Sequence, residues 1–145
     1  MIFLRQVVFL WALVVMMAAC NGQNAQQRAR WDQQNILDYR YTVKVSCFCP
    51  PPAGQAIVVE VKNGLTTSVK NAQTGEAVDL KFLERFSTVA KLFEVIAEAE
   101  ARNAAKLEVE YNPQFGFPTQ AMIDYIAQAA DDELGFWVEG FEVWP

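Results

Sequence analysis

The strongest constraint on the fold is an alternation of apolar and polar residues that recurs along the chain. In residues 39–46, aromatic and β-branched side chains occupy every second position, and the positions between them are polar. Residues 107–111 and 136–143 alternate in the same way, with a one-residue change of phase around Gly140. Because successive side chains of a strand point to opposite faces, this pattern predicts half-buried strands, with a β-bulge at the change of phase.

The segment 57–69 predicts a β-hairpin around Lys62-Asn63-Gly64. A two-residue Asn-Gly loop would place Val61 opposite Thr66, which mixes apolar and polar side chains. A three-residue loop with Gly64 in the left-handed conformation brings residues of the same kind together, and we therefore expect this bulged turn. The expected pairs in that register are Val61 with Leu65, Val59 with Thr67 and Ile57 with Val69.

Two segments predict helices. From Leu83 onward, apolar residues recur at intervals of three or four, which indicates an amphipathic helix near residues 87–103 with Ser87 or Thr88 as its N-cap. Residues 28–37 have a helix-compatible composition and predict a short helix. The residues of this short helix that we expect to face inward are Trp31 and either Ile36 or Leu37.

The N-terminal residues have the pattern of a lipoprotein signal peptide. Only Arg5 is charged before the thirteen residues 7–19, which carry neither charge nor amide. Such a run is too short to span a bilayer as a helix. It ends in Met17-Ala18-Ala19-Cys20, which resembles the lipobox of bacterial lipoproteins. We therefore expect residues 1–19 to be a signal peptide, and residues 20–27 to be a lipidated cysteine with a flexible polar tether.

The resemblance to a lipobox implies a location. Cys20 would carry fatty acyl chains, and several chains together give stable membrane anchoring. Asn21 follows this cysteine, whereas an aspartate at that position usually retains a lipoprotein in the inner membrane. We expect an envelope lipoprotein on the periplasmic side, with the outer membrane favoured over the inner.

Charge and histidine content exclude several functions. Without residues 1–19 the chain has 126 residues and a net charge of −6, because Arg5 is the only charge lost. An acidic balance argues against binding to nucleic acid. The chain contains no histidine, which excludes Ser-His-Asp and Cys-His nucleophilic sites and imidazole metal sites. We expect no catalytic residues and no cofactor.

Several motifs together indicate a family. They are Trp31…Asn35, Asp38-Tyr39-x-Tyr41, Ser46-Cys47-x-Cys49-Pro50, Tyr111-Asn112-Pro113-x-x-Gly116-Phe117-Pro118, Asp124 and Asp131-Asp132-Glu133-x-Gly135-Phe136. This set resembles a family of uncharacterised bacterial lipoproteins, of the domain of unknown function 6174 type. The resemblance covers essentially the whole chain after the leader, implies a strand over residues 119–125, and brings no assigned activity.

With that strand, the chain predicts a single α+β domain over residues 28–145. The expected order is αβββαβββ, with one antiparallel sheet of about six strands, a short N-terminal helix and one central amphipathic helix. One face of the sheet should pack against the helices. The other carries polar side chains such as Thr42, Lys44, Glu108 and Glu110, and should be exposed to water.

Cys47 and Cys49 lie at the end of the first predicted strand. If Cys20 is lipidated, they are the two remaining cysteines, in an oxidising compartment. A disulfide requires Cβ atoms about 3.8 Å apart, closer than residues i and i+2 lie in a regular strand. We favour a disulfide that bends the chain into the run 50–52 of three prolines over two free thiols.

The acidic residues near the C-terminus leave three interpretations open. We favour a solvated turn in which one aspartate accepts backbone hydrogen bonds. The alternatives are a calcium site with oxygen ligands and a carboxylate pair that hydrolyses a glycoside. The residues concerned are Asp124, Asp131, Asp132 and Glu133.

Aromatic residues supply a candidate binding surface. Phe115 and Phe117 lie in a Pro- and Gly-containing loop between two strands, and Trp137 alternates with the inward-facing Phe136. The structural interpretation is that the loop residues form a turn and cover the end of the sheet. The functional one is that the loop and Trp137 contact a partner in the envelope. We expect a non-enzymatic binding module whose surface is the exposed sheet face and this aromatic loop. The alternative is a calcium-binding or hydrolytic domain that uses the acidic loop Asp131–Glu133.

Overall fold

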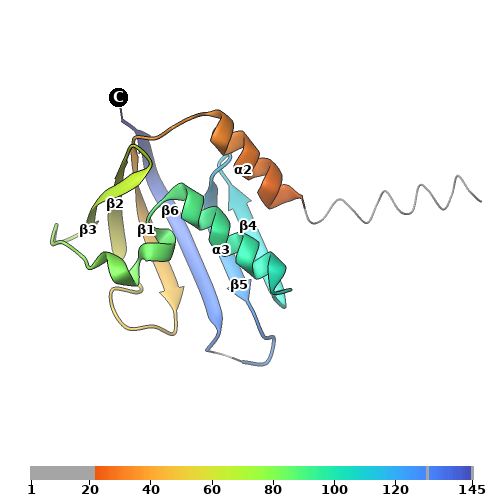
Figure 1. The fold of residues 1–145 in the computed structure, drawn as a ribbon. Coiled ribbons are helices and arrows are strands. Elements are labelled where there is room, and N and C mark those ends of the chain that lie inside the picture. The colour runs from red at the N-terminus through yellow and green to blue at the C-terminus, as the bar shows by residue number, and fades with distance from the viewer. Residues whose placement is uncertain (1–21, 130, 145) are drawn as a thin grey trace, which may run out of the picture.

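The computed structural model describes residues 22–129 and 131–144, in which six strands form one antiparallel sheet (Figure 1). The strands are β1 (Tyr39–Cys47), β2 (Ala56–Lys62), β3 (Leu65–Asn71), β4 (Lys106–Tyr111), β5 (Pro118–Asp124) and β6 (Glu133–Val143). The helices are α2 (Gln23–Gln33) and α3 (Val89–Ala101), and two short 3-10 turns, η1 (Leu80–Phe82) and η2 (Glu84–Phe86), precede α3. The α+β class and the order αβββαβββ are confirmed.

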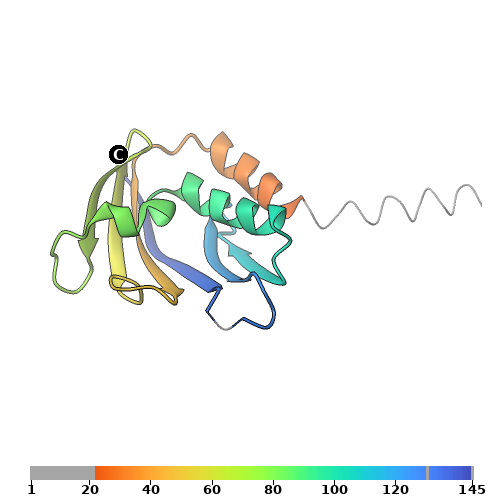
Figure 2. The same cartoon turned by 60° about the horizontal axis from the view of Figure 1, so that its bottom comes forward.

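The sheet consists of two three-stranded meanders joined in the middle. Its order is β3-β2-β1-β6-β5-β4, so β1 and β6 are the central pair. The two helices lie side by side on one face of the sheet (Figure 2). Because β1 and β6 are antiparallel, Cys47 at the end of β1 lies opposite Leu134 at the start of β6. The loops after β1 and before β6 therefore meet at the same end of the sheet.

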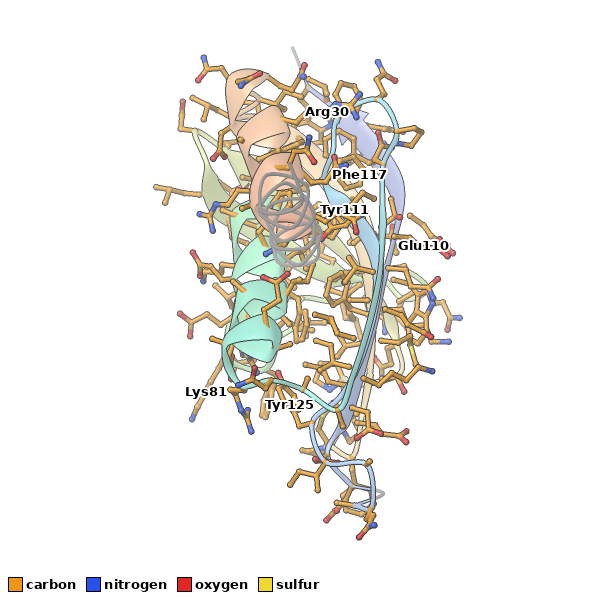
Figure 3. All side chains as sticks on the ribbon, turned by 90° about the vertical axis from the view of Figure 1, so that its right-hand side faces the viewer. Arg30, Lys81, Glu110, Tyr111, Phe117 and Tyr125 are labelled. Carbon is orange, nitrogen blue, oxygen red and sulfur yellow. A yellow bond between two sulfur atoms is a disulfide. The ribbon has the colours of Figure 1, made fainter. Side chains whose placement is uncertain are left out.

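The core lies between the helices and the sheet. Tyr39, Tyr41, Val43 and Val45 of β1 are buried, as their alternation predicts. Figure 3 shows Tyr111 and Phe117 between the helices and the sheet, whereas Glu110 lies on the opposite face. The buried residues of α3 are Val89, Leu92, Phe93, Val95, Ile96 and Ala99.

Two tyrosine hydroxyls of β1 hold the start of α3 above the sheet. The hydroxyl of Tyr41 donates a hydrogen bond of 2.6 Å to the carbonyl oxygen of Phe86, and the backbone N–H of Val89 donates to the Tyr39 hydroxyl over 3.1 Å. Burial raises the pKa of both tyrosines. Thr88 is the N-cap, as expected, and its hydroxyl accepts from the N–H of Lys91.

The turn between β2 and β3 differs from the expected one. Asn63 (φ +51°) and Gly64 (φ +74°) both lie in the left-handed region, which is the geometry of a two-residue hairpin loop. The expected pairing of Val61 with Leu65 is wrong, because Val61 lies opposite Thr66. The mixed pair is stable because the Thr66 hydroxyl donates to the carbonyl of Ser87.

A bulge then restores the apolar register of this hairpin. Glu60 pairs with Ser68 and Val59 with Val69, so Thr67 is the extra residue of β3. The expected pairs Val59 with Thr67 and Ile57 with Val69 are therefore wrong by two positions. The shift places Val59 and Val69 together on the buried face. The second expected bulge, around Gly140 (φ +59°), is confirmed by the register shift between β1 and β6.

The first helix begins five residues earlier than expected. It spans Gln23–Gln33 rather than residues 28–37, so residues 23–27 of the predicted tether are helical. Its anchor is Asn24, which is 4% exposed, donates to the carbonyl of Phe93 and accepts from the Tyr111 hydroxyl. Burial is the main cause that raises the pKa of Tyr111 to about 12.

The C-terminal end of this helix also differs. Asn35 adopts φ +51°, a left-handed conformation that ends a helix. Trp31 is buried and Ile36 packs against the core, as expected, but Leu37 is about half exposed. In the part of the chain that the structure describes, no helix is long and apolar enough to cross a membrane.

Helix α2 packs directly on the loop 112–117. Arg30 donates to the carbonyl oxygens of Pro113 (2.5 Å) and Gln114 (3.2 Å). Gly116 has φ +84°, and a Cβ atom there would lie 3.0 Å from the backbone oxygen of Gln27. Only glycine fits both the backbone conformation and this close approach.

We predict that Gly116→Ala destabilises the protein more than Gly75→Ala. Both glycines have positive φ, but a Cβ atom at Gly75 (φ +72°) would meet nothing within 4 Å. Gly75→Ala should therefore cost only the backbone strain, roughly 1–2 kcal/mol. Gly116→Ala adds the displacement of α2 and should cost roughly 3 kcal/mol in all. Equal urea midpoints for the two variants would show that α2 does not pack on this loop.

Candidate functional site

A hollow of about 360 Å³ lies at the end of the sheet where β1 ends and β6 begins. Three parts of the chain that are distant in the sequence line it: the loop after β1, the 3-10 turns before α3, and Tyr125 with residues 131–134. We call this hollow the strand-end cleft. The antiparallel pairing of β1 with β6 brings the first and third segments together, and the hydrogen bond from Tyr41 to Phe86 places the second.

The floor of the strand-end cleft is apolar and its rim is aromatic. Val45, Leu83 and Phe86 lie at the base and are at most 6% exposed. Phe48 and Phe82 also line the cleft, and they are 88% and 56% exposed. Large apolar side chains held in water beside an apolar hollow are typical of a binding surface.

Cys47 and Cys49 are at disulfide-bonding distance, with Cα atoms 5.3 Å apart, as the preferred prediction requires. Phe48 lies between them, so this short loop presents its ring at the rim of the cleft. The chain then turns back onto β1, where the N–H of Gly54 donates to the carbonyl of Val45 over 2.7 Å. The cysteine pair and this hydrogen bond limit the positions that Phe48 can reach.

One wall of the strand-end cleft carries polar atoms without partners. Both carboxylate oxygens of Asp132 and the hydroxyl of Tyr125 each have less than 1 Å² of accessible surface. None of these atoms makes a hydrogen bond to any residue that the structure describes. The guanidinium of Arg102 lies 4.0 Å from the centre of the Tyr125 ring and so holds the ring in place at the end of α3.

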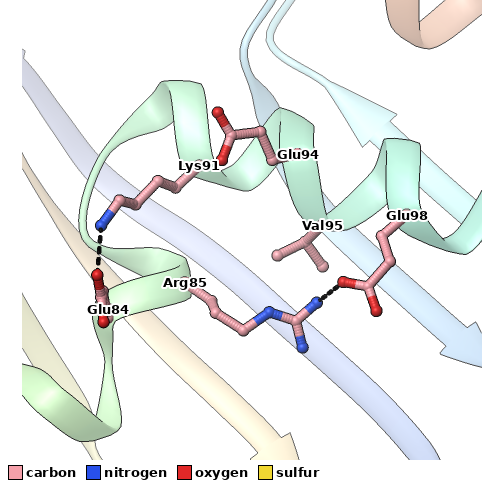
Figure 4. Close-up of a pocket in the computed structure, with 6 residues that line it drawn as sticks. All are labelled: Glu84, Arg85, Lys91, Glu94, Val95 and Glu98. Atoms are coloured by element: carbon pink, nitrogen blue, oxygen red, sulfur yellow. Dashed lines mark hydrogen bonds and ion pairs between the residues drawn. The ribbon is translucent and has the colours of Figure 1, made fainter.

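The positively charged residue that lines the strand-end cleft already has a partner. Arg85 lines the strand-end cleft, but its guanidinium bonds to the carboxylate of Glu98. Figure 4 shows this pair with the second ion pair, Lys91 to Glu84, in a smaller hollow of about 240 Å³. The charged ends of these pairs are well exposed, and such pairs contribute little to stability. They do assign Arg85 to Glu98 rather than to Asp132.

The acidic residues that we considered as a metal site are not gathered by the fold. Asp124 lies opposite Glu133 across β5 and β6, and it accepts a hydrogen bond from the N–H of Ile126. This is the backbone-capping role of the favoured interpretation, here played by Asp124. Among residues 22–129 and 131–144, no group of three or more acidic or sulfur side chains is placed to hold a metal ion.

The two phenylalanines that we considered as part of a binding surface are buried or half-buried. Phe117 is 1% exposed and packs edge-to-face against Trp31, with ring centroids 5.8 Å apart. Phe115 is half-buried and stacks beside Phe117 and Phe141. These contacts support the structural interpretation of this loop, because the phenylalanines cover the end of the sheet beneath α2.

Trp137 lies on the other face of the sheet. A Cβ atom at Gly135 would be 3.0 Å from the indole ring and 3.0 Å from the sulfur of Met122, so these two side chains cover the bare glycine. Trp137 faces away from Phe115 and Phe117, and the three residues form no common site. Trp137 protects Gly135 within its own sheet face.

Sequence patterns found only part of the strand-end cleft. The two cysteines and the acidic residues 131–133 of its lining were candidates, but its aromatic residues were not. Phe48, Phe82 and Tyr125 come from three segments that no motif connects. The available signal was Phe48, a large apolar residue between two cysteines and ahead of three prolines. Asp132 was considered as a metal ligand, but the structure shows it as a single unpartnered carboxylate.

Comparison with known proteins gives one match. The model of a family described as a family of unknown function, DUF6174, matches residues 23–143. The search of curated proteins and the search of solved structures found no match.

We predict that Asp132→Asn stabilises the free protein. An enclosed carboxylate without a donor raises the free energy of the folded state, and the neutral amide removes that charge. The melting temperature should rise, with a gain of about 1–3 kcal/mol in the free energy of unfolding. Glu108→Gln, an exposed carboxylate of β4, is the matched control and should change little. A less stable Asp132→Asn variant would show that the carboxylate is structural.

Proposed function

The chain belongs to this family of unknown function, and from its own residues we propose that it is an envelope-anchored lipoprotein. The proposed lipoprotein binds a partner protein at the strand-end cleft and does not catalyse a reaction. The observation that supports binding is the enclosed, unpartnered carboxylate of Asp132 beside an apolar floor and an aromatic rim. Ligand sites commonly combine an apolar hollow with a few such convergent polar groups.

The lipid anchor is the second part of the proposal. It rests on the resemblance of Met17-Ala18-Ala19-Cys20 to a lipobox, and these residues lie outside the described ranges. Because α2 already begins at Gln23, two residues lie between Cys20 and the helix, and three Cα–Cα steps connect them. Such a connection reaches at most about 11 Å. A lipidated Cys20 would therefore hold the domain at the bilayer surface rather than on a long tether.

Lipidation should depend on Cys20 alone. With a radioactive or clickable fatty acid, the wild-type protein should be labelled and found in the membrane fraction, whereas Cys20→Ala should lose both properties. Cys49→Ser is the matched control, because it removes a thiol and should leave labelling intact. If Cys20→Ala remained labelled and membrane-bound, the anchoring part of the proposal would be wrong.

Binding at the cleft is tested in the same cells with a photocrosslinking amino acid. Placed at Phe48 or Phe82, it should give a crosslinked species of defined mass. Placed at Glu108 or Glu110, on the far face of the sheet, it should give none. Crosslinks from the far face alone would move the binding surface away from the strand-end cleft.

A further inference from the structure

The strand-end cleft also indicates what kind of side chain its partner presents, an inference that rests on the function proposed above. Asp132 is the decisive residue, because both of its carboxylate oxygens are enclosed and unpartnered. An uncompensated carboxylate shielded from water is unfavourable. A cationic hydrogen-bond donor supplied from outside the domain would remove that penalty.

Two arginines near this wall have other partners. Arg85 bonds to Glu98, and Arg102 bonds to Glu98 over 3.3 Å and stacks on Tyr125. The remaining acidic residues of the lining, Asp131 and Glu133, add further negative charge at the exposed rim. Charge complementarity therefore requires a cation from the partner.

A metal ion does not fit this wall. Calcium takes six to eight oxygen ligands, and in the ranges that the structure covers no three acidic or sulfur side chains converge. An organic cation fits better, because it needs only the two carboxylate oxygens and the Tyr125 hydroxyl as acceptors. Two free oxygens on one carboxylate match the paired N–H groups of a guanidinium.

The rest of the cleft favours a cation that has a long apolar stem and apolar residues on either side. Its floor of Val45, Leu83 and Phe86 is buried, which suits the methylene stem of a long side chain. Phe48 and Phe82 are exposed at the rim, where they would contact apolar residues on either side of the cation. A small free cation would leave both rings in water, whereas a polypeptide would cover them.

We propose that the strand-end cleft binds an arginine of a partner protein, presented in an extended segment with apolar residues on either side. The guanidinium forms a paired hydrogen bond with Asp132, its stem lies over the apolar floor, and the flanking residues pack against Phe48 and Phe82. The Tyr125 hydroxyl accepts a further hydrogen bond from the same group.

Four capped pentapeptides test this proposal against the intact protein by calorimetry or fluorescence anisotropy. The probe is Ala-Phe-Arg-Phe-Ala, and the matched peptides carry Lys, Gln or Glu in its central position. The arginine peptide should bind the wild-type protein at least about tenfold more tightly than the glutamine peptide, since a charge-assisted pair contributes more than a neutral one. The lysine peptide should bind with intermediate affinity, and the glutamate peptide most weakly.

Two variants and one control variant locate the interaction. Asp132→Asn should abolish the preference for arginine over glutamine, while Glu108→Gln should preserve it. Phe48→Ala should weaken the binding of all four peptides by a similar factor, because it removes an apolar contact at the rim and leaves the Asp132 carboxylate in place. Phe48 is exposed, so its truncation should leave the fold intact.

The outcomes separate this inference from the function on which it rests. If all four peptides bind equally and Phe48→Ala weakens each of them, the arginine assignment is wrong and the cleft remains a binding site. If Asp132→Asn retains the preference for arginine, the assignment is wrong as well. If Phe48→Ala and Asp132→Asn both leave binding unchanged, or no peptide binds, the arginine assignment fails, and crosslinking from Phe48 decides separately whether the cleft binds anything.

Discussion

The antiparallel pairing of β1 with β6 is the interaction on which the rest of the structure depends. It joins two meanders that would otherwise each have an edge strand with unpaired backbone N–H and C=O groups, and it places the two strands at the centre of the sheet. Because β1 ends where β6 begins, the cysteine loop and the acidic segment meet at one end. The tyrosines of β1 then hold η2 and the start of α3 above that end.

The two ends of the domain differ in whether their enclosed polar groups have hydrogen-bond partners. Around α2 they are mostly satisfied, since Asn24 bridges Phe93 and Tyr111 through its amide. Gln27 keeps one unpartnered oxygen there, pressed against Gly116 at a packed contact. At the strand-end cleft, by contrast, the enclosed atoms without partners belong to residues that line a hollow. Native structures rarely leave such groups unsatisfied, and exceptions concentrate at functional sites.

The sequence predicted elements with a strong local signal and failed where tertiary contacts decide. The alternation of apolar and polar residues predicted β1 and β4. Apolar residues at intervals of three or four, together with the Thr88 N-cap, predicted α3. The start of α2 has no amphipathic pattern, because one buried amide, Asn24, fixes it. The turn at Asn63-Gly64 was missed because the bulge at Thr67, which recovers the register, leaves no mark in the hydrophobic pattern.

The candidate site was predictable only in part, for a physical reason. A motif within one segment, such as Cys47 and Cys49 two residues apart, can be seen in the sequence. The strand-end cleft requires three segments, whose approach follows from strand pairing and from the hydroxyl of Tyr41. The exposure of Phe48 and the burial of Phe117 likewise depend on which face of the sheet the helices cover. From the sequence alone, each of these phenylalanines could be a buried packing residue or an exposed binding residue.

Titration of the arginine peptide into the isotope-labelled protein, followed by nuclear magnetic resonance, maps the contact surface. The strand-end cleft, rather than the opposite face of the sheet, should be that surface. The backbone amide signals of residues 47–49, 53, 82–86, 125 and 131–134 should shift together and saturate with one affinity. Shifts centred on Met122 and Trp137, with the cleft residues unaffected, would contradict the account.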